Sequence, residues 1–487
     1  LVPANPTLAR VCSKHELNAL SFSMERELAR EFDAAPAGGI PRSCLGVAPQ
    51  VVVSFGYASG HVVSVGADLG ACALASNGSV SRRAVGRYAH LIYDLALLSG
   101  ARLPLRPGVI DSHSAPGCSA ATASQSELNG VGSATVSIPG SPFGVASSPD
   151  APWSFVALDG LPATSGTPAS AIVGRLAVMS DATFAPALVR TIGVSAGGLA
   201  GVALSADGRY LIATAQTGAT AAYVLSTSRL EDASADPVLG ALSIPDEVVD
   251  GPIEAVTSRD SRFAFVSIEY SDEIAVFDLR SAIAHDFRTS GFVGTIALGR
   301  SVVGMAISPD GKWLYATSDQ DGSRPVGALS VISVPRAESD PAHAVRANVT
   351  AGCGPVRAAV SPDGQSVWVT ARESNALLRF SASLLLRHPA HALTADLRVG
   401  QAPVGLALVN NGQQIIVADS NRFMVRGASA QLTIIDTSSA QTGKPAIAGY
   451  LPTGLFPREE SLEPNGTLLI TDFLSRQVQA VDTTHLP

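Results

Sequence analysis

Charged residues occupy three positions of a repeated sequence phrase at which the other copies carry glycine. When the seven copies are aligned on the residue two after the turn proline or its equivalent, the aligned residues are Gly144, Gly201, Glu254, Gly304, Arg357, Gly405 and Glu459. The three charged ones are Glu254, Arg357 and Glu459. An arginine can bind a carboxylate through two hydrogen bonds, and a nearby acid can act as a base. Arg458 directly precedes the last position. The candidate ligand-binding residues are therefore Glu254, Arg357, Arg458 and Glu459.

The same charges also have a structural interpretation. Acids and an arginine at equivalent positions of a repeat could pair with one another and fix the geometry of the assembly. Unpaired charges around an open site would favour chemistry, whereas complete pairing in a narrow channel would favour an ion-pair plug. Because the sequence does not choose between them, the catalytic residues and the question of enzymatic activity stay open at this point.

Other chemistry-bearing patterns are weaker. Acids recur after the second apolar run of the phrase, where they could bind a cation or cap turns: Asp159, Glu269, Asp319, Asp419 and Asp472. The G-x-S-x-G match at 193–197 lies in a turn between repeats, whereas a nucleophile elbow needs a strand-to-helix turn. The nine histidines are scattered and no C-x-x-C-H motif occurs. We expect no metal site and no cofactor.

The elements that position these residues follow from the repeat. Seven copies of the phrase each contain a turn marker between two apolar runs, at Asp150, Asp207, Asp260, Asp310, Asp363, Asn411 and Asn465. A period of about 50 residues with several short strands per copy is typical of propeller blades. The sequence therefore predicts a mainly β fold, a seven-bladed β-propeller whose inner strands line a channel that glycine keeps open. A linear solenoid is the alternative.

The repeats also predict the domain organisation. The chain ends after the third strand of blade seven, so the strand at 134–138 is expected to supply the outer strand of that blade and close the ring. Residues 134–487 form the propeller, 125–133 a linker, and 1–124 a small α+β module. In this module we expect a helix after the capping box at 13–16, a hairpin at 51–65 and a second helix at 85–95.

The repeat resembles that of the YVTN family of seven-bladed propellers. The residues that carry the resemblance are Ser308-Pro-Asp-Gly311 with Tyr315-Ala-Thr-Ser318, Ser361-Pro-Asp-Gly364 with Trp368-Val-Thr-Ala371, and the closing phrase from Phe456 to Asp472. The resemblance covers about residues 134–487. The resemblance implies the propeller fold. Relatives in fold include lactonase-like, surface-layer, secreted binding and haem-binding propellers.

Five cysteines bear on the compartment. Four lie in the first quarter of the chain, which favours a Cys44–Cys72 disulfide and, as a second pair, Cys12–Cys118. Disulfides would require an oxidising compartment, and free thiols in a cytosolic protein are the alternative. The chain begins at Leu1, which is compatible with a cleaved signal peptide. We expect a secreted, cell-surface or periplasmic protein.

Two function classes follow. The net charge of −8 argues against nucleic-acid binding, and no apolar run is long enough to span a membrane. The first class is a non-enzymatic binding propeller that presents loops and the channel mouth to a small molecule, glycan or protein. The alternative is a lactonase-like hydrolase or lyase acting on a small acidic substrate, with Glu254 or Glu459 as base and Arg357 or Arg458 holding the substrate.

Overall fold

A computed structural model describes most of the second unit and short stretches of the first. The described residues are 8–12, 17–19, 51–56, 62–67, 74–77, 81–83, 109–112, 114–118, 121–159, 174–180, 184–194, 196–218, 220–233, 235–245, 249–320 and 326–487. The chain divides into two compact units. The first comprises residues 1–107 with 321–325, and the second comprises 108–320 with 326–487.

The described part of the first unit is an antiparallel sheet in the order β2-β1-β3-β4-β5-β6. Its strands are β1 (Leu8–Cys12), β2 (Leu17–Ala19), β3 (Val51–Gly56), β4 (Val62–Ala67), β5 (Leu74–Ser76) and β6 (Ser81–Arg83). The hairpin predicted at 51–65 is present as β3 and β4. Leu17–Ala19 is a strand where the first predicted helix was expected, because it pairs with β1. The remainder of that helix and the second one lie outside the described residues.

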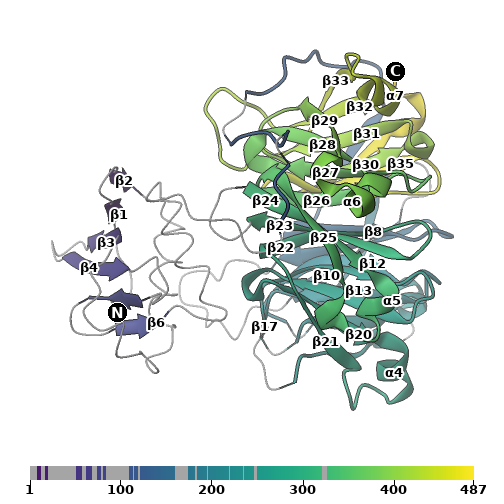
Figure 1. The fold of residues 1–487 in the computed structure, drawn as a ribbon. Coiled ribbons are helices and arrows are strands. Elements are labelled where there is room, and N and C mark those ends of the chain that lie inside the picture. Colours follow the sequence, from purple (N-terminus) through teal and green to yellow (C-terminus); the bar gives the residue numbers. More distant parts are fainter. Residues whose placement is uncertain are drawn as a thin grey trace. The chain divides into compact units, whose positions relative to one another are not determined.

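Seven four-stranded antiparallel sheets make up the second unit, which is a seven-bladed propeller (Figure 1). The fold class predicted from the repeat is confirmed for this unit. Blades one to three contain β8 (Ser141–Ser147), β9 (Trp153–Asp159), β10 (Gly174–Ser180) and β11 (Ala187–Val194); β12 (Leu199–Leu204), β13 (Tyr210–Ala215), β15 (Ala222–Ser226) and β16 (Val238–Leu242); and β18 (Pro252–Thr257), β19 (Phe263–Ile268), β20 (Glu273–Asp278) and β21 (Phe292–Ala297).

Blades four to seven follow the same plan. They contain β22 (Arg300–Ile307), β23 (Trp313–Gln320), β24 (Val326–Ser333) and β25 (Val345–Cys353); β26 (Pro355–Val360), β27 (Ser366–Ala371), β28 (Ala376–Ser381) and β29 (Leu393–Arg398); β30 (Pro403–Val409), β31 (Gln414–Asp419), β32 (Gln431–Asp436) and β33 (Ile447–Pro452); and β34 (Pro457–Leu462), β35 (Thr467–Asp472), β36 (Gln477–Asp482) and β7 (Ser133–Ser137). A two-stranded sheet joins β14 (Thr217–Gly218) and β17 (Val249–Asp250).

The ring closes through β7, which is the outer strand of blade seven. It pairs antiparallel with β36, with Val136 opposite Val478. This is the strand that the sequence analysis assigned to that edge. Because β7 precedes blade one and β36 belongs to the last blade, their pairing joins the two ends of the ring and removes an open edge.

Turns between the first and second strands explain the Ser-x-Asp part of the phrase. The Ser308 hydroxyl donates to Asp310 Oδ1 at 2.6 Å and accepts from the Trp313 N–H at 3.0 Å, while the Lys312 N–H also donates to Asp310 Oδ1. Gly311 has φ +71°, which suits glycine. These hydrogen bonds, the Ser308 bond first, hold the pKa of Asp310 below its ordinary value. The repeated marker is therefore a turn device.

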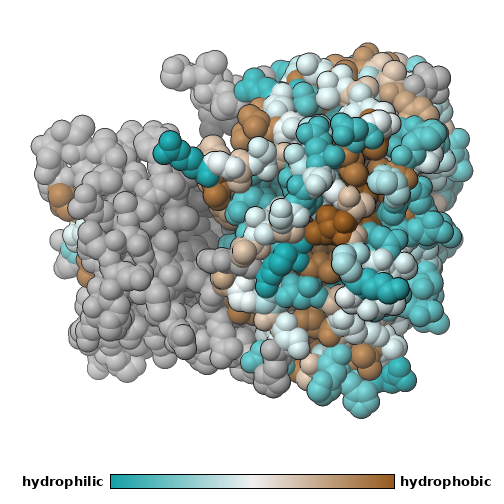
Figure 2. Space-filling model, turned by 90° about the horizontal axis from the view of Figure 1, so that it is seen from above, coloured by the Kyte–Doolittle hydropathy of each residue, from teal (hydrophilic) through white to brown (hydrophobic). Residues whose placement is uncertain are grey.

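The core lies between neighbouring blades. One cluster joins Phe265 of blade three to Leu314 of blade four, and another joins Leu469 of blade seven to Val156 of blade one. Each sheet buries both faces against its neighbours, which is why single blades need the ring. On the face that Figure 2 shows, small apolar groups lie among hydrophilic residues over the described part of the surface.

Short helices follow the third strands of blades two to six. They are α3 (Thr227–Asp232), α4 (Leu279–Ala284), α5 (Val334–Ala337), α6 (Ala382–Arg387) and α7 (Thr437–Thr442), and the 3₁₀ turns are η4 (Glu269–Ser271), η5 (Pro341–His343), η6 (Arg372–Ser374), η7 (Pro389–His391), η8 (Asn410–Gly412) and η9 (Thr483–His485).

None of the helices in the described ranges is long and apolar enough to cross a lipid bilayer.

The described residues between 109 and 132, here called the strap, lie along the outer strands of three blades. The Ile110 N–H donates to the Asn348 carbonyl of β25, the Ala123 N–H to Val399 after β29, and the Leu128 N–H to Tyr450 of β33. Ile110 and Leu128 also pack against two of the inter-blade clusters. This differs from the expected boundary at residue 124 and linker at 125–133, because the backbone of this segment is used by the propeller.

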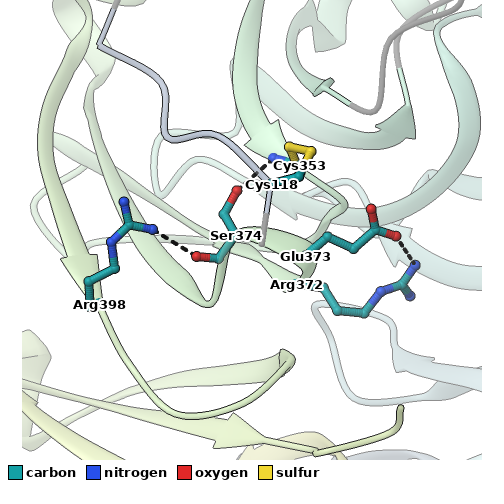
Figure 3. Close-up of a disulfide and its surroundings, with 6 residues drawn as sticks. All are labelled: Cys118, Cys353, Arg372, Glu373, Ser374 and Arg398. Atoms are coloured by element: carbon teal, nitrogen blue, oxygen red, sulfur yellow. Dashed lines mark hydrogen bonds and ion pairs between the residues drawn. A yellow bond between two sulfur atoms is a disulfide. The ribbon is translucent and has the colours of Figure 1, made fainter. Parts of the chain in front are cut away.

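A disulfide fixes the strap to the ring. Cys118 is bonded to Cys353 at the end of β25, across 235 residues of sequence (Figure 3). The Cys353 N–H donates to the Ser374 hydroxyl at 2.9 Å, and Arg398 donates to the Ser374 carbonyl at 2.8 Å. The bond therefore ties the strap to the junction of blades four and five.

This pairing corrects the sequence-based assignment. The predicted Cys12–Cys118 bond is wrong, because Cys118 is already bonded to Cys353. Proximity in sequence favoured a partner in the first quarter of the chain, whereas the strap carries Cys118 to a blade far along the sequence. The predicted Cys44–Cys72 bond lies outside the described residues.

Candidate functional site

Glycines on the inner strands bring neighbouring blades into close contact around the axis. A Cβ added to Gly201 would lie 2.4 Å from the Ile253 carbonyl oxygen, and one added to Gly304 would lie 2.4 Å from that of Val356. Glycine is therefore required here by the approach of the next strand. The expectation that glycine serves to keep the channel open is corrected, since these positions face backbone.

Hydroxyl groups of the second strands link each of several blades to the next. The Thr214 hydroxyl donates to the Ile253 carbonyl at 3.1 Å, and Thr471 donates to the Phe143 carbonyl at 2.9 Å. The Thr471 hydroxyl also accepts from the Glu459 N–H at 3.0 Å. Because Thr471 belongs to blade seven and Phe143 to blade one, this bond reinforces the closure of the ring.

Three predicted site residues converge at the axis. The Arg357 Nε donates to Glu459 Oε1 at 2.6 Å, and a second guanidinium nitrogen binds the same oxygen. Arg357 Nε also lies 3.7 Å from Glu254 Oε2. The Arg357 side chain is only 6% exposed, whereas those of Glu254 and Glu459 are 23% and 20% exposed. We call Glu254, Arg357 and Glu459 the axial triad.

Backbone groups complete the pairing of the axial triad. Arg357 Nη1 donates to the Val356 carbonyl at 2.8 Å, and Glu254 Oε2 accepts from the Met305 N–H at 3.1 Å. Burial raises the pKa of Glu254 to about 8; the Arg357 cation opposes this shift and the Glu459 carboxylate adds to it. The triad thus has the internal pairing expected of an ion-pair plug, and its guanidinium is occupied by protein groups.

Arg458 lies apart from the triad although it precedes Glu459 in sequence, because adjacent strand residues point in opposite directions. Its guanidinium carbon lies 3.5 Å from the centroid of the Phe143 ring, 4.9 Å from that of Phe456 and 5.3 Å from that of Phe473. The rings also contact one another, with Phe456 and Phe473 5.5 Å apart. A cation over aromatic faces is favourable, and more so where water is excluded.

The Arg458 guanidinium has unused hydrogen-bonding capacity. Its Nε is buried and has no hydrogen-bond partner. Across the described ranges, no carboxylate oxygen lies within 4.0 Å of the Arg458 guanidinium, in contrast to Arg357 and Arg372. Burial, with the cations of Arg357 and Arg422 adding to it, lowers the pKa of Arg458 to about 9. The side chain is therefore still charged at neutral pH.

Loops after the second strands add more charge beside Arg458. Arg372 donates to Asp319 Oδ2 at 2.9 Å and lies 3.9 Å from Glu373 Oε1. Burial raises the pKa of Glu269, and the Asp319 carboxylate adds to the shift, while Arg372, Arg422 and Arg458 oppose it. These loops contact the starts of the first strands: the Arg372 N–H, for example, donates to the Gly354 carbonyl. They therefore lie at the end of the ring at which the first strands begin, which we call the loop end.

Aromatic and apolar residues of blades six and seven continue this surface. The Arg422 guanidinium carbon lies 5.4 Å from the Phe456 ring and 5.7 Å from the Phe423 ring. The exposed large apolar residues on these loops are Phe423 (50%), Met424 (77%), Val425 (42%), Leu455 (63%) and Leu474 (51%). The Leu474 N–H donates to the Leu455 carbonyl, so these two leucines are neighbours.

Sequence reasoning named Arg458 but missed Arg372, Arg422, Phe423, Phe456 and Phe473. The acids expected to gather after the second strands separate into two groups. Glu269 and Asp319 interact with the arginines of these loops, whereas Asp419 and Asp472 accept hydrogen bonds from side chains of their own blades. Arg372 and Phe473 directly follow the second strands β27 and β35, and that position was the available signal for these two residues. No group of three or more metal-ligating side chains occurs within the described part of the chain.

Comparisons with known proteins give a fold relative. No protein-family model matches the chain, and no curated protein matches it. Among solved structures, hydrazine synthase of Kuenenia stuttgartiensis is similar with a TM-score of 0.52 at 17% identity. The similarity covers 72% of this chain and 97% of that chain. A similarity at this level of identity concerns the fold alone.

Proposed function

We propose that this chain is a binding propeller whose ligand site lies at the loop end of the channel around Arg458. The observation that carries the proposal is the contrast between two arginines. The Arg357 guanidinium is already paired with Glu459, Glu254 and a backbone carbonyl. The Arg458 guanidinium instead packs among aromatic rings, and its buried Nε has no hydrogen-bond partner. A buried polar group without a partner is costly, and binding sites are places where such groups meet a ligand.

The axial triad supports this assignment because its charged groups pair with one another and are not available to a ligand. A general base must have access to the substrate proton, and an arginine that stabilises an oxyanion must have free donors. Arg357 already directs three donors to protein oxygens. We therefore assign Glu254, Arg357 and Glu459 to holding the ring, and we favour binding over the lactonase-like hydrolase or lyase.

The disulfide supports an extracytoplasmic location. Structural disulfides persist mainly in oxidising compartments, and Cys118–Cys353 joins two parts of the propeller. We propose that the protein works in a secreted, cell-surface or periplasmic setting. We also propose that its blades are YVTN-type repeats, because the Ser-Pro-Asp-Gly turn and the strand threonines both have structural roles here.

A ligand screen tests the proposed function. The full chain is melted in the presence of organic acids, phosphate esters, oligosaccharides and short peptides, beside the Arg458→Gln variant. We expect at least one class to raise the melting temperature of the wild type and not that of Arg458→Gln. Arg209→Gln is the matched control, since Arg209 also lies over an aromatic ring, that of Tyr210, but is paired with Asp207. Shifts that are equal in wild type and Arg458→Gln would contradict the proposal.

A further inference from the structure

The ligand class can be argued from three features of the site around Arg458, and this argument rests on the proposed function. The first feature is a pair of arginines that have no carboxylate partner among the described residues. Arg458 and Arg422 share the Phe456 ring, at 4.9 Å and 5.4 Å, and neither has a carboxylate within 4.0 Å among the described residues. Charge-assisted bonds from a guanidinium to a carboxylate are among the stronger polar interactions in proteins.

The second feature limits the charge of that anion. Glu269 and Glu373 lie in the 3₁₀ turns η4 and η6, and Asp319 lies near the end of β23. All three interact electrostatically with this group of arginines. A dianion would meet repulsion from these carboxylates and would lose more hydration on entering a partly apolar site. A ligand with a single negative charge therefore fits this mixture of arginines and carboxylates better than a dianion does.

The third feature is a set of exposed apolar residues next in the chain to the rings that contact Arg458. Phe456 and Phe473 contact Arg458, and the residues next to them in the chain, Leu455 and Leu474, are 63% and 51% exposed. Phe423, 50% exposed, extends the surface on the side of Arg422. Exposed apolar side chains gathered beside a polar anchor are typical of sites for ligands with an apolar body.

We infer that the site around Arg458 binds a monocarboxylate with an apolar body, its carboxylate on Arg458 and Arg422 and its apolar part on Leu455 and Leu474. Two sources share this chemistry: a free alkyl or aryl carboxylic acid, and the C-terminal carboxylate of a peptide that ends in an apolar residue. Both use the same anchor and the same apolar surface, so the experiment separates them by the probe.

Calorimetric titration of the full chain tests the inference. Octanoate is the acid probe, octanamide is its neutral match, hexylmalonate is the dianionic match, and N-acetyl-dileucine represents a peptide end. We expect octanoate or N-acetyl-dileucine to bind about tenfold or more tightly than octanamide, as a charge-assisted bond implies. Hexylmalonate should bind more weakly than octanoate. Whichever carboxylate binds more tightly identifies the source.

Variants locate the binding. Arg458→Gln should weaken binding of the carboxylate about tenfold or more, and Leu474→Ser should weaken it a few-fold without affecting the fold, because Leu474 is exposed. Arg209→Gln should change nothing. Equal binding of octanoate and octanamide, or unchanged binding by Arg458→Gln, would overturn the inference. If a different class in the ligand screen depends on Arg458, the ligand class fails while the proposed function stands.

Discussion

At the residue scale, two arginines two blades apart divide the charged chemistry of the propeller between structure and binding. Repeat register alone places Glu254, Arg357 and Glu459 at equivalent positions, and the structure brings their side chains together. The sequence could not show that Arg458 faces the other way into aromatic rings, because those rings come from β8 and from two loops of blade seven. Only the fold makes them neighbours.

The raised pKa of Glu254 gives a prediction at this scale. With a folded pKa of about 8 against an ordinary 4.5, the folded protein holds a proton that the unfolded chain releases. The stabilising contribution is thus present below pH 4.5 and is lost as the pH rises towards 8. Between pH 5 and pH 8.5 these two pKa values correspond to a loss of about 4 kcal/mol in the free energy of unfolding. Glu254→Gln should not show this loss, as measured by urea unfolding at the two pH values.

A surface variant is the control for this measurement. Asp286→Asn changes a carboxylate whose side chain is 86% exposed, so its effect should be similar at both pH values. If wild type and Glu254→Gln showed parallel stability profiles from pH 5 to 8.5, the assignment of a raised pKa to Glu254 would be wrong.

At the element scale, strands and turns were predictable where a local pattern fixes them. The Ser-Pro-Asp-Gly turns and the hairpin of β3 and β4 follow from such patterns. Leu17–Ala19 shows the opposite case, because a capping box predicts a helix locally whereas pairing with β1 makes the segment a strand. Arg422 and Phe423 were missed because they lie in a loop with no counterpart in the repeat.

The hydroxyl contacts between blades give the prediction for this scale. Thr471→Val keeps the shape of the side chain but leaves the Glu459 N–H and the Phe143 carbonyl without this partner. We expect a loss of about 1–3 kcal/mol in the free energy of unfolding. Thr394→Val is the control, since Thr394 is exposed and bonds within its own blade. Equal stability of the two variants would argue against a closure role for Thr471.

At the scale of the whole molecule, the ring is fastened twice, by β7 in blade seven and by the strap with its disulfide. The closing strand could be read from the count of strands in the last repeat. The strap could not, because its Ser-, Gly- and Ala-rich composition is that of a linker, and its order comes from backbone bonds to β25 and β33. The partner of Cys118 was likewise set by the fold.

Removing the disulfide tests the second fastening. The bond spans 235 residues, and its loss enlarges the conformational freedom of the unfolded chain. The Cys118→Ser/Cys353→Ser variant should lose about 2–5 kcal/mol in the free energy of unfolding, and reduction of the wild type should have the same effect. If reduction and substitution both left the melting temperature unchanged, the strap would have no role in stability.

The central claim is that Arg458, whose Nε has no hydrogen-bond partner, receives the ligand, and that the axial triad does not. The most direct measurement is a calorimetric titration of octanoate into wild type, Glu254→Gln and Arg458→Gln, with N-acetyl-dileucine as a parallel series. We predict that Glu254→Gln binds as the wild type does and that Arg458→Gln loses about tenfold or more in affinity. Loss of binding by Glu254→Gln with full binding by Arg458→Gln would contradict the claim and return the site to the axis.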